Sequence, residues 1–487
     1  MWVKSWAAGI GCLILAVSSS SVSASASVAA VPNISLAPTS GPPGTTITVD
    51  GSGFGKTEMV DVYLGTTDEV LASTTLTGSF SIALTIPSSA TPGTHWVTGN
   101  GRHSGLSAQA GFDVRTNWAQ FGDNPAHGGH NTTENLLSPK TAAGIHLKWS
   151  DTIGSFRSSS PAVFNGVVYV GSDNKVYALS ETTGKQLWSY TTGALVESSP
   201  AVVSGVVYVG SDDSNVYALS AASGKRLWSY ATGNEVFSSP AVANGVVYIG
   251  SNNGEVFAIG ASSGKRLWSY STGSNLDTSP AVANGVVYVG SNDGNIYALS
   301  ESSGKLLRYT ATGGIVFSSV AVANGVGYVG SNDGNVYALS PSSGVPLWSY
   351  TTGGAVTSSP AVANGVVYVG SDDTKVYALD ASSGKRLWSY ATRGAVNSSP
   401  AVADGVVYVG DNDGDVYALS AASGTLLWFY DTGGLVESSP AVANGVVYVS
   451  HDGQIDAFGP SGGINGALRP IPQTLRHDLA LRVAEIP

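Results

Sequence analysis

The sequence predicts an all-β protein in which a small β-sandwich precedes an eight-bladed β-propeller. Composition is one reason, because glycine accounts for 62 of the 487 residues and 11% of residues are charged, against about 25% in an average soluble domain. The chain is also rich in Val, Tyr, Ser and Thr, which favour strands over helices. The third observation is a repeat of about 40 residues that fills most of the chain and carries hairpin signals.

Two anchors mark the repeat. The first is the string Ser-Pro-Ala-Val, with prolines at Pro161, Pro200, Pro240, Pro280, Pro360, Pro400 and Pro440. The second is a tryptophan, found at Trp149, Trp188, Trp228, Trp268, Trp348, Trp388 and Trp428. Val320 and Arg308 stand in the remaining places, so each anchor has eight copies.

Each repeat contains signals for four strands. Asn244-Gly245 tolerates the positive φ angles of a type I′ hairpin, and Asn292-Asp293-Gly294 and Ser263-Gly264 mark the other turns. Four short strands per repeat are typical of a propeller blade. The first copy holds only the last strand, near Trp149, and the last copy holds only the first three, ending near Phe458. We therefore expect the N-terminal strand to complete the C-terminal blade and close the ring.

Residues 1–30 read as a Sec-type signal peptide. Lys4 precedes an apolar stretch from Trp6 to Val17, and a run of small residues follows. The apolar stretch is too short to span a bilayer, so no transmembrane segment is expected. The sequence thus predicts a secreted, cell-surface or periplasmic protein. Cys12 is the one cysteine, so cleavage would leave no disulfide and no catalytic thiol.

The remaining boundaries follow from composition. Residues 32–115 form the predicted sandwich, 116–144 a linker, 145–459 the propeller and 460–487 a C-terminal tail. The motif Pro38-Thr39-Ser40-Gly41-Pro42-Pro43-Gly44-Thr45, with the strand and the Gly-Ser-Gly-Phe-Gly segment after it, resembles the IPT/TIG class of immunoglobulin-like domains. His127 and His130 lie three apart in the linker and are interpreted as part of a polar loop, not as a metal site.

The stretch from Ala378 to Trp388 resembles the tryptophan-docking motif of PQQ-type propeller repeats. The resemblance covers the whole ring and implies eight blades, with the seven anchor tryptophans packed between neighbours as structural docking residues. One large flat side chain at each boundary buries about 200 Å². The same repeat occurs in quinone-dependent dehydrogenases and in non-enzymatic propellers, including an outer-membrane assembly scaffold, so it does not fix a function.

The most variable position of the repeat lies three residues before the proline anchor, and we call it the slot. We expect the links that carry it to gather on one face around the central channel. The slot residues are then a candidate binding ring; the alternative is neutral variation at an exposed loop position. They are Ser158, Glu197, Phe237, Asp277, Phe317, Thr357, Asn397 and Glu437.

A quinone cofactor is not expected. Pyrroloquinoline quinone carries three carboxylates and favours Arg, Lys or a bridging Ca²⁺, whereas the slot ring holds three carboxylates and no cation. Arg157 and Arg393 lie nearby, and Glu197, Asp277 and Asn397 have the right types for a Ca²⁺ shell. However, the adjacent cysteine pair and the inter-blade insertions that the resemblance implies for such enzymes are missing.

The favoured function is therefore an exported non-catalytic binding or interaction scaffold. We expect a monomer that presents one propeller face to a protein or glycan ligand. A formal charge of −11 argues against nucleic acid as a partner. Two alternatives remain: a PQQ- and calcium-dependent dehydrogenase of alcohols or sugars, and a structural cell-surface component.

One blade boundary departs from the repeat. Arg308 replaces Trp, Val320 replaces Pro, and Gly327 replaces Val within 20 residues. Loss of a buried Trp costs about 3–5 kcal/mol in a typical core. We predict that this boundary opens first on unfolding.

Overall fold

The computed structural model describes residues 31–65, 67–155, 159–340 and 342–460. Within these ranges the chain is built from strands, turns and one short helix, α1 (Pro139–Ala142), which confirms the all-β class. The predicted signal peptide and all but the first residue of the predicted tail lie outside the described residues.

The N-terminal β domain consists of two sheets, with strand orders β1-β3-β6 and β2-β8-β7-β4-β5. In β3 every second side chain is buried, as expected for a strand with one face on a core. The strands are β1 (Asn33–Ala37), β2 (Ser40–Gly41), β3 (Thr46–Ser52), β4 (Met59–Leu64), β5 (Thr67–Ser73), β6 (Phe80–Thr85), β7 (Gly93–Gly101) and β8 (Ser107–Val114).

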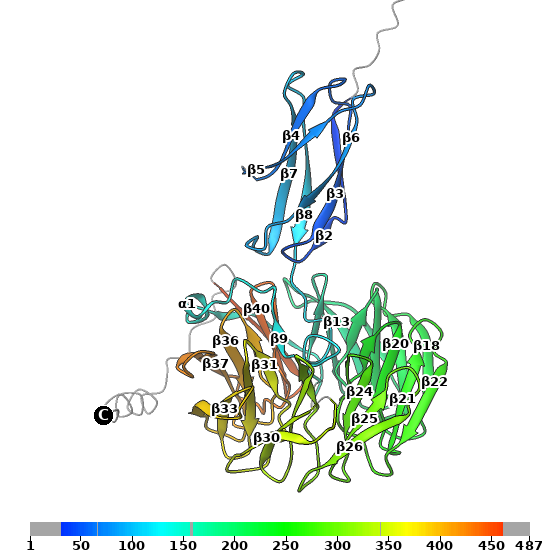
Figure 1. The fold of residues 1–487 in the computed structure, drawn as a ribbon, viewed down its shortest axis with the longest axis vertical. Coiled ribbons are helices and arrows are strands. Elements are labelled where there is room, and N and C mark those ends of the chain that lie inside the picture. Colours follow the sequence, from blue (N-terminus) through cyan, green and yellow to red (C-terminus); the bar gives the residue numbers. More distant parts are fainter. Residues whose placement is uncertain (1–30, 66, 156–158, 341, 461–487) are drawn as a thin grey trace, which may run out of the picture. The chain divides into compact units, whose positions relative to one another are not determined.

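The repeats form eight antiparallel sheets of four strands, which follow one another in chain order around the ring (Figure 1). The innermost strands are β11 (Ala162–Phe164), β15 (Ala201–Val203), β19 (Ala241–Ala243), β23 (Ala281–Ala283), β27 (Ala321–Ala323), β31 (Ala361–Ala363), β35 (Ala401–Ala403) and β39 (Ala441–Ala443). The second strands are β12 (Val167–Ser172), β16 (Val206–Ser211), β20 (Val246–Gly250), β24 (Val286–Gly290), β28 (Val326–Gly330), β32 (Val366–Ser371), β36 (Val406–Gly410) and β40 (Val446–His451).

The outer half of each blade consists of a third and a fourth strand. The third strands are β13 (Lys175–Ser180), β17 (Asn215–Ser220), β21 (Glu255–Gly260), β25 (Asn295–Ser300), β29 (Asn335–Leu339), β33 (Lys375–Asp380), β37 (Asp415–Ser420) and β41 (Gln454–Gly459). The outermost strands are β14 (Gln186–Thr191), β18 (Arg226–Ala231), β22 (Arg266–Ser271), β26 (Leu306–Ala311), β30 (Pro346–Thr351), β34 (Arg386–Ala391), β38 (Leu426–Asp431) and β10 (His146–Thr152).

The ring is closed by strand exchange, as the sequence predicts. Strand β10, from the start of the propeller, pairs antiparallel with β41, from its end. Leu147 lies opposite Phe458 and Thr152 lies opposite Gln454. We call β39, β40, β41 and β10 the closing blade; it joins segments about 300 residues apart in sequence.

Tryptophans pack between neighbouring blades. The Trp188 ring lies 5.9 Å from Tyr169 of its own blade, and its indole N–H donates to Ala221 O of the next blade at 2.8 Å. A Cβ on Gly224 would come within 2.6 Å of the same indole, so the turn must carry glycine there. Equivalent indole hydrogen bonds are made by Trp149, Trp228, Trp268, Trp348 and Trp388.

Two boundaries differ from this pattern. Trp428 lies at the boundary with the closing blade, whose third and fourth strands are not joined by a hairpin that could accept its indole N–H. Its ring packs edge-on against Phe458 at 5.1 Å, and α1 lies beside its strand, β38. Arg308 occupies the docking position, because it pairs with Ala298 as Trp268 pairs with Ala258. Its guanidinium lies 5.9 Å from the Tyr288 ring, so a cation–π contact replaces the aromatic pair.

Residues 116–131, which the sequence presents as a linker, lie along the inner edges of the blades, and we call them the strap. The strap makes a backbone or side-chain hydrogen bond to the central valine of each innermost strand, at 2.6 to 3.0 Å. The partners are Trp118 for Val163, Ala119 for Val202, Gln120 for Val242, Pro125 for Val282, Ala126 for Val322, Gly128 for Val362, Gly129 for Val402 and Asn131 for Val442. The strap ends in β9 (His130–Asn131), which pairs parallel with β35.

The strap satisfies strand edges that face the channel. Innermost strands would otherwise expose unpaired backbone groups there. His127, expected in a polar loop, is instead 2% exposed and meets Phe121 edge-on at 5.2 Å. Burial lowers the pKa of His127 to about 3, so the ring is neutral at physiological pH.

Candidate functional site

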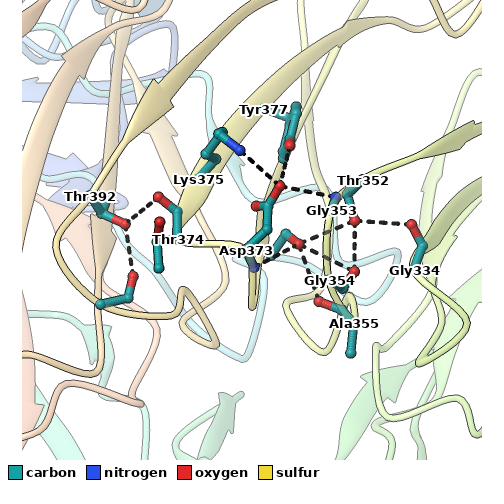
Figure 2. A network of polar contacts seen from close by, with 12 residues as sticks. Gly334, Thr352, Gly353, Gly354, Ala355, Asp373, Thr374, Lys375, Tyr377 and Thr392 are labelled. Atoms are coloured by element: carbon teal, nitrogen blue, oxygen red, sulfur yellow. Dashed lines mark hydrogen bonds and ion pairs between the residues drawn. The ribbon is translucent and has the colours of Figure 1, made fainter.

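The links from each outermost strand to the next innermost strand lie on one face of the ring, which we call the link face. A hydrogen-bond frame that recurs in several blades holds the link against the following blade. Figure 2 shows one copy, in which the Thr352 hydroxyl bonds Gly334 O at 2.9 Å and Gly354 O at 2.7 Å. Asp373, in the β32–β33 turn of the following blade, accepts the N–H of Gly353 at 2.9 Å.

The Asp373 carboxylate is the centre of this frame. It also accepts hydrogen bonds from the Tyr377 hydroxyl and from Lys375 Nζ, which lies 3.1 Å away (Figure 2). Burial alone would raise the pKa of Asp373, but these donors together hold it below its usual value. The same tyrosine–aspartate bond occurs at Tyr217–Asp213, Tyr297–Asp293 and Tyr337–Asp333. The links are therefore positioned by a charged anchor that recurs around the ring.

A closed ring of serines lies just below the links. The backbone N–H of each serine donates to the hydroxyl oxygen of the serine in the next link at 2.8 to 3.1 Å. The N–H of Ser439 donates to the Ser160 hydroxyl, which closes the ring. We call this set the serine belt: Ser160, Ser199, Ser239, Ser279, Ser319, Ser359, Ser399 and Ser439. Val202, which bonds the strap, lies three residues after Ser199, a distance of about 10 Å in an extended chain. The channel is thus lined by hydroxyls toward the link face and crossed by the strap further in.

The structure places the described slot residues on the link face, each two residues before a serine of the serine belt. Ser158 lies outside the described residues. Of the others, Phe317 is 38% exposed, and Glu197, Phe237, Asp277, Thr357, Asn397 and Glu437 are partly exposed. Some neighbours touch: Asn292 donates to Asp277 at 2.8 Å, and the Thr357 hydroxyl lies 3.1 Å from the Asn397 side-chain oxygen.

One pocket of about 170 Å³ opens among these residues, between the closing blade and the two blades that follow it. It brings together two slot residues, Glu197 and Glu437; the other described slot residues do not line it. The full lining is Ser159, Ser160, Glu197, Ser199, Leu435, Glu437, Ser438, Ser450, His451 and Asp452.

The link face is acidic beside this pocket. Asp212, in the β16–β17 turn, is partly buried, and no hydrogen-bond partner reaches its Oδ1 atom. Burial, together with the nearby carboxylates of Glu197 and Glu235, raises the pKa of Asp212 to about 7. A cationic group arriving here would relieve this repulsion.

Sequence reasoning missed three features of the site. The strap sequence is not repeated and the strap bonds largely through its backbone, so its side chains gave no pattern from which its position could be predicted. A second variable position, two residues before the slot, also reaches the link face, with Leu195 40% and Ile315 38% exposed. His451 lines the pocket, and the departure of the last repeat from a serine at that position was the available signal.

The described residues do not suit a quinone with calcium. The described residues that line the pocket include no Lys or Arg, and within the described ranges no group of three His, Cys, Asp or Glu side chains is placed to hold a metal ion. Arg393 is engaged elsewhere, 3.3 Å from Asp415 and 5.6 Å from the Phe429 ring. Arg157 lies outside the described residues. Six docking tryptophans have their N–H groups bonded to the next blade.

The propeller repeats match a known protein family. Residues 139–275, 232–355, 307–400 and 391–465 match the family described as outer membrane protein assembly factor BamB. The chain belongs to this family. The BamB-type repeats cover the ring and begin after the N-terminal β domain, so the IPT/TIG resemblance of that domain stays a prediction.

Solved structures share the BamB-type fold at low identity. BamB from Moraxella catarrhalis matches with a TM-score of 0.57 and 18% identity, over 65% of this chain and 99% of that chain. A europium-containing methanol dehydrogenase matches at 0.63 and 15%, over 71% and 98%. Quinohemoprotein alcohol dehydrogenase from Comamonas testosteroni matches at 0.62 and 17%, over 76% and 85%. These likenesses show the fold alone, which an assembly factor and dehydrogenases have in common.

No curated protein sequence matches the chain. Among the residues that the structure describes, no helix is both long and apolar enough to cross a membrane.

Proposed function

We propose that the protein is an exported, non-catalytic binding scaffold that recognises a protein or glycan ligand with its link face. The observation that carries this proposal is the contrast within each link. The link backbone is held by recurring threonine and serine hydrogen bonds, joined in several blades by an aspartate, whereas the slot side chains differ in charge, size and polarity. A rigid frame with variable exposed side chains is what a recognition surface requires.

The link face offers both apolar and acidic groups. Leu195, Ile315 and Phe317 are each about 40% exposed, and the carboxylates of Glu197 and Asp212 lie near the pocket. Exposed aromatic and aliphatic side chains next to carboxylates suit a partner with apolar and basic groups. The strap crosses the channel beyond the serine belt, which favours binding at the link face over passage through the ring.

Matched leucine variants test this proposal. Leu195→Ser removes an apolar group from the link face, and Leu267→Ser removes one that is 57% exposed on β22, away from it. Binding to an array of glycans and envelope proteins should weaken at least about tenfold in Leu195→Ser, equivalent to about 1.4 kcal/mol, and stay within about twofold in Leu267→Ser. Equal loss in both variants, or loss in Leu267→Ser alone, would contradict link-face recognition.

A titration separates binding from catalysis. We expect no one-to-one complex with pyrroloquinoline quinone and Ca²⁺ at about 100 µM, a weak-binding threshold, and no dye reduction with alcohols or aldoses. Tight binding with dye reduction would replace the proposal with a quinone-dependent dehydrogenase. A protein that stays with the cell wall after salt washing would instead support a structural surface component.

A further inference from the structure

A second cavity lies on the side of the ring away from the links. The innermost strands run from the links to the hairpin turns that lead into the second strands, and we call the side that carries these turns the turn face. A cavity of about 380 Å³ opens there between the blade β15–β18 and the blade β19–β22. Its lining includes Val206, Tyr208, Leu227 and Trp228 from the first blade and the Asn244-Gly245 turn from the second.

An equivalent boundary five repeats further along the chain is filled in the structure. The lining positions recur there with the same residue types, at Val406, Tyr408, Leu427, Trp428, Asn444 and Gly445. Residues 134–145, which we call the plug, pack against this boundary: Leu137 and Ile145 are buried in one cluster with Tyr408 and Trp428. The chain thus shows what kind of segment fits between two of its blades on the turn face.

The plug covers surface that the cavity leaves open. Trp428 is 9% exposed and Val406 is fully buried, whereas Trp228 and Val206 are partly exposed. Leu227 is 54% exposed, whereas the equivalent leucine beside the plug is partly buried. Because identical residues are covered at one boundary and open at the other, the open cavity presents apolar surface suited to a similar segment.

The plug also pairs with the hairpin turn. The Glu134 carboxylate accepts the N–H of Gly445 at 3.0 Å, which is a charge-assisted hydrogen bond. Two residues later, the Leu136 side chain lies against the same turn, since a Cβ on Gly445 would come within 2.8 Å of it. At the cavity, no described residue accepts the N–H of Gly245. The plug therefore binds through the pattern Glu-x-Leu-Leu, and the cavity offers the matching donor and apolar walls.

Charge distinguishes the open cavity from the filled boundary. Arg226 directly precedes the lining residue Leu227, and Lys265 follows the lining residue Ser262 by three positions; both basic side chains are exposed. At the filled boundary, Leu426 stands in place of Arg226. Basic side chains beside an apolar cavity favour an occupant that carries acidic groups as well as leucines.

We propose that this cavity docks an acidic Glu-x-Leu-Leu segment of a partner protein. The carboxylate of the segment accepts the Gly245 N–H, and its leucines cover Leu227 and Trp228. The site lies on the turn face, so it goes beyond the recognition proposed for the link face. Either proposal can fail while the other stands.

Synthetic peptides with the sequence of residues 132–145 test the chemistry. We would measure binding of labelled peptides to the purified protein by fluorescence anisotropy. The unaltered peptide should bind one-to-one, a Glu134→Gln peptide at least about tenfold more weakly, and a peptide with Leu136→Ser and Leu137→Ser at least about a hundredfold more weakly. No binding of the unaltered peptide by the folded protein, or equal binding of all three peptides, would overturn the proposal.

Two other occupants are outcomes of the same assay. A peptide of residues 474–486, from the C-terminal tail of this chain, serves as a further probe. Tighter binding of this probe than of the Glu-x-Leu-Leu peptide would overturn the partner assignment in favour of the tail. Sedimentation that shows a dimer, dissociated by the Glu-x-Leu-Leu peptide, would overturn it in favour of a second copy of the chain.

Matched variants locate the site among the similar blade boundaries. Leu227→Glu should weaken peptide binding at least about tenfold, because it removes an apolar wall and repels the carboxylate. Leu387→Glu makes the same change at the same position of β34, where the leucine is 51% exposed, and should alter binding less than about twofold. Equal loss in both variants, or loss in neither, would overturn the location. Melting temperatures of the two variants confirm that both proteins are folded.

Discussion

Arg308 shows how one residue can alter a blade boundary without changing its register. Its side chain lies over Tyr288, where other blades pack a Trp ring at a tilt against the equivalent Tyr ring, with centroids 5.8 to 6.0 Å apart. We predict that Arg308→Trp stabilises the ring by about 1–2 kcal/mol through added aromatic burial, which raises the melting temperature by about 2–4 °C. Calorimetry of the wild type and the variant checks this. An unchanged or lower melting temperature would show that the boundary has no room for an indole.

Asp212 provides a test of the link-face electrostatics. Burial and neighbouring carboxylates raise its folded-state pKa to about 7, above an unfolded value of about 3.9. The folded state therefore holds the proton more tightly, and the stability that this gives is lost as pH rises from about 4 to about 7. Asn stands at this position in other blades, as at Asn252 and Asn292. Asp212→Asn should match the wild type below about pH 4, where the carboxyl is protonated in both states, and should melt increasingly higher than the wild type as pH rises to about 7. A difference that does not vary with pH would contradict the assigned pKa.

Among the elements, the strap stands out because it touches every blade. Gly129 has a φ of 62°, and a Cβ there would lie 2.6 Å from Ala361 Cβ. Gly205, in the β15–β16 turn, has a φ of 76° with open space around it. Gly205→Ala should cost about 1 kcal/mol for the left-handed backbone alone, and Gly129→Ala about 2–3 kcal/mol, since overpacking adds to it. Equal losses in denaturant unfolding would mean that the strap is not packed against the ring.

The elements also show what a sequence can reveal. Hairpin signals such as Asn244-Gly245 recur in every repeat, so the strands, their pairing and the closure by β10 could be predicted. The strap could not, because it bonds through backbone groups of small residues such as Ala119 and Gly128, which leave no periodic pattern. The slot residues could be placed on one face, but the pocket depends on how two distant repeats meet, and only Glu197 and Glu437 of the slot line it.

At the scale of the whole molecule, closure by one strand pair holds the ring together. Thr152 and Gln454 face each other across β10 and β41, and both are exposed. With Cys12 changed to Ser, a disulfide between Cys replacements at 152 and 454 should stabilise the ring by up to about 4 kcal/mol, because the closed loop is long. The pair Lys175 and Thr191 holds the same place within one blade and closes a short loop. Its disulfide should give a smaller gain; equal gains would indicate that the ring ends do not separate on unfolding.

Recognition by the link face is the central claim, and photo-crosslinking tests it most directly. A photoreactive phenylalanine analogue replaces Phe317, which is 38% exposed on the link face, or Leu267, which is 57% exposed on an outermost strand. Each protein is irradiated with the host envelope fraction, and the adducts are identified by mass spectrometry. We predict one discrete adduct from position 317 and none from position 267. Adducts from position 267 alone, or the same adducts from both positions, would contradict the account.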